Sequence, residues 1–68
     1  METVVIDIVG MRCQACVKTV NALLETIPGV GQVEVALEAG QARIAYDPEL
    51  AHVGQLRDAI EAAGFDTR

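Results

Sequence analysis

The sequence GMRCQAC, residues 10–16, joins two segments of different hydrophobic period and holds both cysteines of the chain. Residues 3–9 before it are rich in β-branched side chains, which is typical of a strand. Gly10 interrupts that strand. In residues 14–27, apolar side chains recur every three or four positions, which indicates a helix. The stretch therefore predicts a strand-to-helix turn, with Cys13 in the loop and Cys16 at the start of the helix.

The remainder of the chain repeats this alternation of periods. Residues 31–47 alternate apolar and polar side chains on both sides of Ala39-Gly40, which predicts a β-hairpin. Residues 52–63 carry a second helical stripe, which begins near His52 and ends at Gly64. Residues 65–68 leave room for a short edge strand. The order β-α-β-β-α-β predicts one domain over residues 1–68, an α+β ferredoxin-like sandwich with an antiparallel four-stranded sheet and two helices on one face.

This topology predicts which segments surround the cysteines. The Ala39-Gly40 turn and the Gly64-Phe65 turn are expected at the same end of the sandwich as Cys13 and Cys16. His52 and Pro28-Gly29 are expected at the opposite end.

Composition and charge narrow the classes of function. Apolar residues make up 51% of the chain, with one Tyr, one Phe and no Trp, so the core is expected to be aliphatic. The net charge of −5 argues against nucleic-acid binding, which needs clustered cations. No apolar run approaches the roughly 20 residues of a membrane span. Residues 1–10 contain Glu2 and Asp7 and lack the basic start of a signal peptide, so a cytoplasmic location is expected.

Two cysteines at this spacing can share one metal ion or close one disulfide. The start of the helix, Arg12 and Lys18 all favour the thiolate form. Two sulfur ligands alone do not complete a zinc site, and His52 is expected at the far end. A pair of soft thiolates suits Cu(I), and Ag(I) or Hg(II) would bind for the same reason. An ion with so few ligands is easily passed to other thiolates, which indicates a carrier rather than an enzyme.

The segment Gly10 to Cys16, together with Pro28-Gly29-Val30 and Gly64-Phe65, resembles the heavy-metal-associated domain family. The resemblance implies that Cys13 and Cys16 bind Cu(I), while Met11 packs under the loop without binding the metal. Arg12 and Phe65 are expected to support the site. The implied function is a soluble copper metallochaperone, a monomer that copper can link into a dimer. The implied partner is a copper-transporting P-type ATPase or its metal-binding domain.

Three alternatives remain open at this point. An N-terminal metal-binding domain of a copper-transporting ATPase is favoured by Phe65, whereas the length and Met1 favour a free chaperone. A thiol-disulfide redox protein would use the same two cysteines. A carrier of Hg(II) would bind its ion in the same way.

Overall fold

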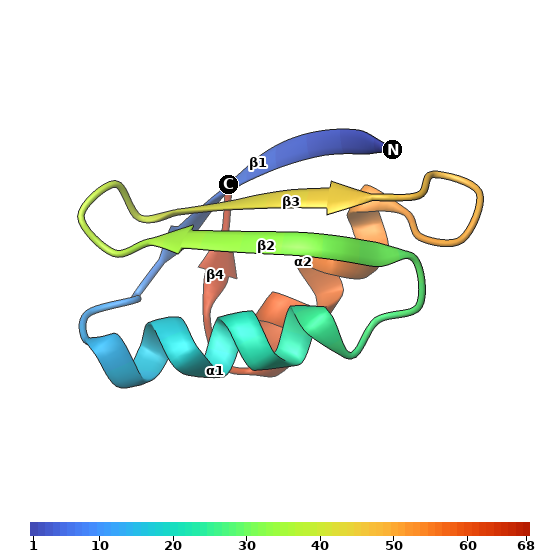
Figure 1. Cartoon of the computed structure of the whole chain (residues 1–68). Helices are drawn as coiled ribbons and strands as arrows, with labels where there is room; N and C mark the ends of the chain where they lie inside the picture. Colours follow the sequence, from blue (N-terminus) through green and yellow to red (C-terminus); the bar gives the residue numbers. More distant parts are fainter.

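The computed structural model describes residues 1–68 and contains four strands and two helices. In chain order these are β1 (Glu2–Val9), α1 (Gln14–Glu25), β2 (Val30–Ala36), β3 (Gln41–Tyr46), α2 (Val53–Ala62) and β4 (Asp66–Thr67). The sheet has the order β2-β3-β1-β4, and each neighbouring pair is antiparallel. Both helices cover the same face of the sheet (Figure 1). The predicted ferredoxin-like sandwich and its short edge strand are confirmed.

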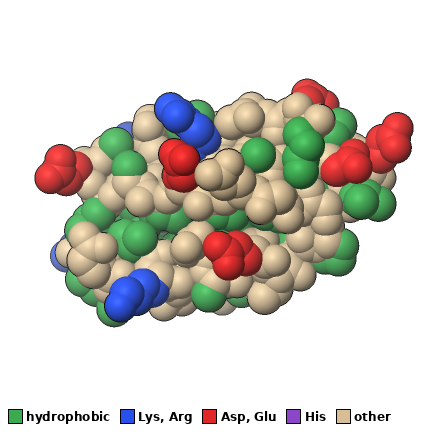
Figure 2. All heavy atoms as spheres, in the orientation of Figure 1, with side chains coloured by type: hydrophobic (Ala, Val, Ile, Leu, Met, Phe, Trp, Pro, Cys, Tyr) green, Lys and Arg blue, Asp and Glu red, His purple; other side chains and the backbone are tan.

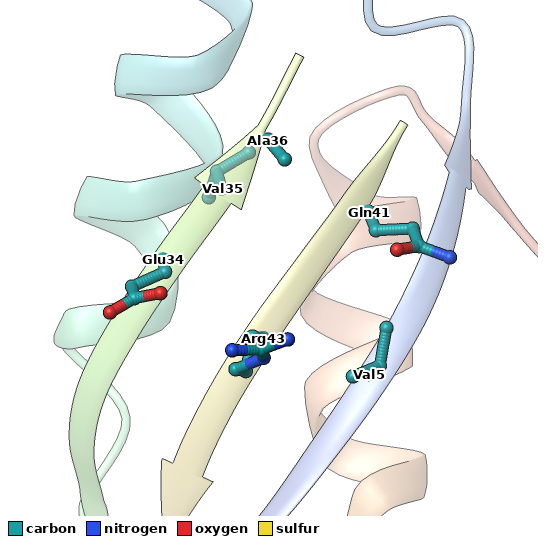
Figure 3. Close-up of a pocket in the computed structure, with 6 residues that line it drawn as sticks. All are labelled: Val5, Glu34, Val35, Ala36, Gln41 and Arg43. Atoms are coloured by element: carbon teal, nitrogen blue, oxygen red, sulfur yellow. The ribbon is translucent and has the colours of Figure 1, made fainter. Parts of the chain in front are cut away.

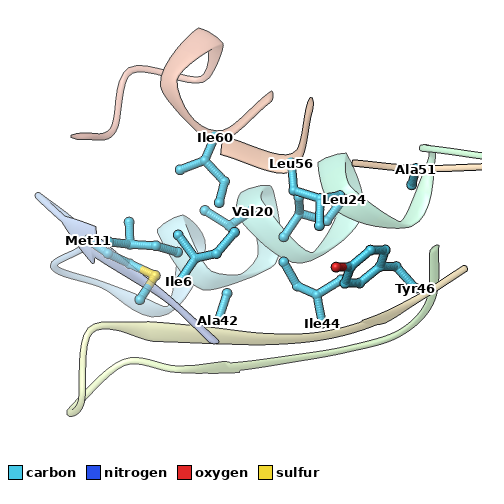
Figure 4. Packing of buried hydrophobic residues seen from close by; sticks show 11 residues of the cluster. Ile6, Met11, Val20, Leu24, Ala42, Ile44, Tyr46, Ala51, Leu56 and Ile60 are labelled. Carbon is cyan, nitrogen blue, oxygen red and sulfur yellow. The ribbon is translucent and has the colours of Figure 1, made fainter. Parts of the chain in front are cut away.

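The core between the sheet and the helices is aliphatic, as the composition predicted (Figure 4). Six large side chains are completely buried there: Ile6, Val20, Leu24, Ile44, Leu56 and Ile60. Burial of each of these contributes about 1.5–3 kcal/mol to folding. Met11 and Tyr46 close the two ends of this cluster, and each is 8% exposed.

The boundaries of the elements differ from the sequence-based expectation at several points. Helix α1 begins at Gln14, with Cys13 in extended conformation as its N-cap. The start at residue 14 agrees with the helical period of residues 14–27, and Cys16 is the third residue of the helix, within its first turn, rather than its first residue. Both helices end earlier than predicted, and the hairpin connection spans residues 37–40 rather than Ala39-Gly40 alone.

The grouping of segments at the two ends of the sandwich agrees with the prediction. At one end, the N–H of Ile8 donates to the carbonyl of Gly40 at 2.7 Å, and Val9 pairs with Asp66. At the other end, the N–H of Asp47 donates to the carbonyl of Gly29 at 2.7 Å. Neither helix has the length and hydrophobicity needed to cross a lipid bilayer.

Candidate metal centre

The turn that leads into the cysteines depends on Gly10. This residue has a φ of +95°, a conformation that residues with a side chain rarely adopt. A Cβ atom placed on Gly10 would lie 3.9 Å from Cδ1 of Phe65, which is an ordinary contact distance. Backbone conformation, rather than lack of space, is therefore what requires glycine here. The turn sends the chain from the end of β1 toward the start of α1.

Cys13 sets the position of both thiols through its backbone. It is the N-cap of α1, and its carbonyl accepts hydrogen bonds from the N–H groups of Cys16 at 3.0 Å and Val17 at 3.2 Å. The Cys13 side chain makes no capping hydrogen bond to the helix, and it is exposed to solvent. Cys16 is one turn further on and is half-buried. The pair thus consists of an accessible thiol in the loop and a more sheltered thiol on the helix.

The two thiols are close enough to act on one ion. Their Sγ atoms lie 3.0 Å apart, and both cysteines are free. With metal–sulfur bonds of about 2.3 Å, two sulfurs on opposite sides of an ion stand about 4.6 Å apart. Binding in that geometry therefore requires the sulfurs to separate. Because Cys13 is exposed at the end of a loop, its side chain is the one free to rotate.

The surroundings favour the thiolate form of Cys16. A hydrogen bond from the Cys13 thiol and a second from the backbone N–H of Arg12 lower the pKa of Cys16 below its ordinary value. Partial desolvation acts in the opposite direction and is weaker. Both hydrogen bonds are stronger to a charged sulfur than to a neutral one. A larger fraction of Cys16 is thus ionised to the thiolate near neutral pH than of an ordinary cysteine.

No group of three or more His, Cys, Asp or Glu side chains that could hold a metal ion occurs in this structure. His52 is the N-cap of α2, and the adjoining Leu50 and Ala51 lie against Gly29 at the end far from the cysteines. The chain therefore offers two sulfur ligands at the loop and no third ligand of these types beside them.

The three residues expected to support the site lie in different environments. Met11 points into the core beside Ile6 and Val20 and is 8% exposed (Figure 4). Arg12 is exposed on the loop. Phe65 is half-buried against the core and reaches the Gly10 turn from the segment after α2. The topology thus brings Phe65 beside the cysteine loop, although 49 positions separate it from Cys16 in the sequence.

Two features of the site were not predicted from the sequence. One is the double acceptor role of the Cys13 carbonyl, and the other is the thiol–thiol hydrogen bond. The first could have been found by treating Cys13 as an N-cap, since an N-cap carbonyl accepts the first helical hydrogen bonds. The second depends on side-chain rotamers, for which the sequence holds no signal.

The model of the heavy-metal-associated domain family matches residues 5–66. The chain is 39% identical to the copper chaperone CopZ of Bacillus subtilis over 66 residues, which cover 97% of this chain and 96% of CopZ. A solved structure of a copper-binding domain from HMA7, a P-type ATPase, superimposes with a TM-score of 0.97 at 34% identity. That match covers 100% of this chain and 92% of the solved domain.

Similarity also extends to much longer proteins. The chain is 45% identical over 56 residues to the probable copper-transporting ATPase PacS of Synechococcus elongatus. The match covers 82% of this chain but only 8% of that ATPase. The shared unit is therefore one small part of PacS and nearly the whole of CopZ.

Proposed function

The chain belongs to the heavy-metal-associated domain family, and from this we propose that it is a soluble copper metallochaperone. It carries one Cu(I) ion between Cys13 and Cys16 and passes it to a thiol-bearing partner. The observation that carries the proposal is the isolated pair of thiols, 3.0 Å apart and without a third ligand beside them. The alignment with CopZ over 96% of its length supports the chaperone role.

The preference for Cu(I) follows from the donor set. Thiolates are soft ligands, and Cu(I) accepts fewer ligands than zinc, which takes four in structural sites and three plus water in catalytic ones. The lowered pKa of Cys16 supplies one thiolate with little competition from protons. The loop has no cluster of carboxylates of the kind that suits hard cations.

The supporting residues have separate roles in this proposal. Met11 anchors the loop to the core through packing and leaves its sulfur outside the coordination sphere. The positive charge of Arg12, beside Cys13, offsets the net negative charge of two thiolates on a monovalent ion. Phe65 covers the Gly10 turn and shields that side of the loop from water.

Transfer proceeds by exchange of thiolate ligands. A partner thiolate forms a bond to Cu(I), giving a three-coordinate ion, and the bond from the ion to Cys13 then breaks. Cys13 leaves first because it is exposed and lies in the loop, whereas Cys16 is half-buried on α1. A second partner thiolate then replaces Cys16. The oxidation state of copper does not change at any step.

The partner, the assembly and the location are part of the same proposal. We expect a copper-transporting P-type ATPase, or its metal-binding domain, to receive the ion in the cytoplasm. Residues 1–68 act as one domain, and the chain is a monomer that copper can link into a dimer.

A second candidate is a metal-binding domain of a copper-transporting ATPase. The 45% identity to PacS and the superposition on the HMA7 domain favour it. In that case the same two thiols receive copper instead of delivering it. The reading frame around the coding sequence distinguishes the two candidates, since an ATPase continues into long hydrophobic segments.

Copper transfer tests the chaperone role directly. The reduced, Cu(I)-loaded chain is mixed with the copper-free metal-binding domain of a copper-transporting ATPase, and the two proteins are separated and assayed for copper. We expect copper to equilibrate between them faster than it dissociates into a strong chelator without the domain. A transfer rate no greater than the dissociation rate contradicts a direct exchange mechanism. The Cys13→Ser variant is the matched control, and it should not deliver copper.

A further inference from the structure

The edge of the sheet at β2 is open and contributes no residue to the cysteine site. Strand β2 lies at one end of the sheet order and has β3 as its only neighbour. Backbone groups of alternate residues in an antiparallel strand point to opposite sides. The hydrogen bond from the N–H of Ile8 to the carbonyl of Gly40 shows which residues of β3 direct their backbone groups toward β1. The backbone of Arg43 therefore points the other way and pairs with the backbone of Glu34 in β2. The N–H and C=O groups of Val33 and Val35 therefore point outward, and no turn or loop hydrogen bond uses them.

A furrow lined by apolar side chains runs beside this edge. Val33 and Val35 face the helix layer and are half-buried. Figure 2 shows apolar side chains in the furrow between the sheet and α1 on this side of the molecule. Helix α1 packs against β2, and its residues Val17 and Asn21 are both half-buried.

Asn21 adds an unused acceptor to this helix. Its Oδ1 atom is buried and has no hydrogen-bond partner. Buried polar atoms in folded proteins are nearly always paired, so an unpaired one requires an explanation. A donor from a segment that lies in the furrow would satisfy it.

Acidic side chains accompany the open edge. Residues 30–40 contain Glu34 and Glu38 and no Lys or Arg. Glu34 lies on the outer face of the sheet, beside a shallow hollow, and Figure 3 shows its side chain leaning away from Arg43 on β3. Its carboxylate is thus available to a residue on a strand added next to β2.

We propose that the edge of β2 binds an extended segment of a partner protein by strand addition. The segment pairs with the backbone of Val33 and Val35. Its residues opposite these valines are apolar and enter the furrow, while the residue opposite Glu34 is Lys or Arg and faces the outer side. A second copy of this chain fits less well, because each copy carries a net charge of −5 and only acidic charges along this edge.

The test uses two synthetic pentapeptides, acetylated and amidated, with the sequences TVKVT and TVEVT. Titration into the isotopically labelled protein is followed by NMR, together with hydrogen exchange. With TVKVT, we expect saturable shifts of the Val33 and Val35 amides, and exchange at these amides slower by about tenfold. TVEVT should bind about fivefold more weakly, because attraction to Glu34 becomes repulsion. In the Glu34→Lys variant, TVEVT should bind more tightly than TVKVT.

Proline variants separate strand addition from other modes of binding. Val35→Pro removes an outward N–H without removing a bond to β3, so the fold should survive while TVKVT binding is lost. Val5→Pro is the matched control, since its N–H points outward from β1 beyond the two-residue β4, and binding should be unchanged.

Three results would overturn the proposal. One is no shift at Val33 and Val35 at peptide concentrations on the order of 10 mM. Another is tighter binding of TVKVT than of TVEVT by the Glu34→Lys variant. The third is a dimer in sedimentation that already protects both amides without peptide, which would assign the edge to a second copy.

Discussion

Truncation of Met11 tests whether this residue supports the metal loop from the core. Its side chain is 8% exposed and packs at the end of the core nearest the loop. Met11→Ala removes three heavy atoms, which at about 0.8 kcal/mol per buried methylene-sized group amounts to about 2 kcal/mol. The cavity left behind brings the expected loss to about 2–4 kcal/mol.

This loss is large for a chain of this size. At about 0.05–0.15 kcal/mol per residue, 68 residues have a free energy of unfolding of about 3–10 kcal/mol. The melting temperature should fall by about 15–30 °C. Urea unfolding of the reduced, metal-free protein, followed by circular dichroism, measures the free energy directly. Leu50→Ala is the matched control, because Leu50 is 63% exposed and its truncation should change stability by less than about 0.5 kcal/mol.

Met11→Leu separates packing from metal binding. Leucine conserves most of the volume, so the cost to stability should be below about 1.5 kcal/mol. Since the thioether is not a ligand in our account, Cu(I) affinity measured by chelator competition should stay within about threefold of wild type. A loss of affinity of about tenfold or more in Met11→Leu would make the sulfur a ligand. Unchanged stability in Met11→Ala would mean that the packing argument is wrong.

Three further predictions concern the turn, the helix start and the thiol. Gly10→Ala should lower the free energy of unfolding by about 1–2 kcal/mol, because Gly10 has a φ of +95°. Gly54→Ala should raise it by about 0.5–1 kcal/mol, because Gly54 lies in α2 with open space around it. Chemical denaturation of the two variants measures both changes. His52→Ser should stabilise α2 by about 0.5–1 kcal/mol, because serine can make the N-cap hydrogen bond that His52 does not make. The Cu(I) affinity should not change, and weaker copper binding would place His52 at the site. Because folding lowers the pKa of Cys16, the stabilisation from its thiolate is present above the pKa of the unfolded chain and is lost as pH falls through the folded pKa. Cys13→Ala removes the largest cause of this shift, so the pH at which Cys16 is half-alkylated by iodoacetamide should rise; no rise would contradict the thiol–thiol hydrogen bond.

The order of the first five elements could be predicted because each carries a clear hydrophobic period, whereas the two-residue β4 was predicted only from the room that residues 65–68 leave. The sequence also predicted that Phe65 meets the cysteine loop, since antiparallel pairing of β1 with β4 leaves few other arrangements. The helical period predicted the start of α1 at residue 14, but Cys13 was not identified as its N-cap, because its side chain makes no capping bond. The last turn of α1 was misplaced because the hydroxyl of Thr26 bonds the carbonyl of Leu23, which apolar periodicity does not reveal.

Other features of the site lay beyond sequence patterns. The 3.0 Å separation of the thiols depends on side-chain rotamers. The roles of Cys13, Cys16, Met11, Arg12 and Phe65 toward copper stay predictions that experiments must decide.

A Cu(I) titration of the reduced protein against a strong chelator tests the central claim most directly. Wild type, Cys13→Ser and Cys16→Ser should be compared, with Zn(II) titrated in parallel. Our account predicts one tightly bound Cu(I) per chain, loss of that binding in either variant, and much weaker binding of Zn(II). One-to-one Cu(I) binding that survives the loss of either cysteine would contradict it.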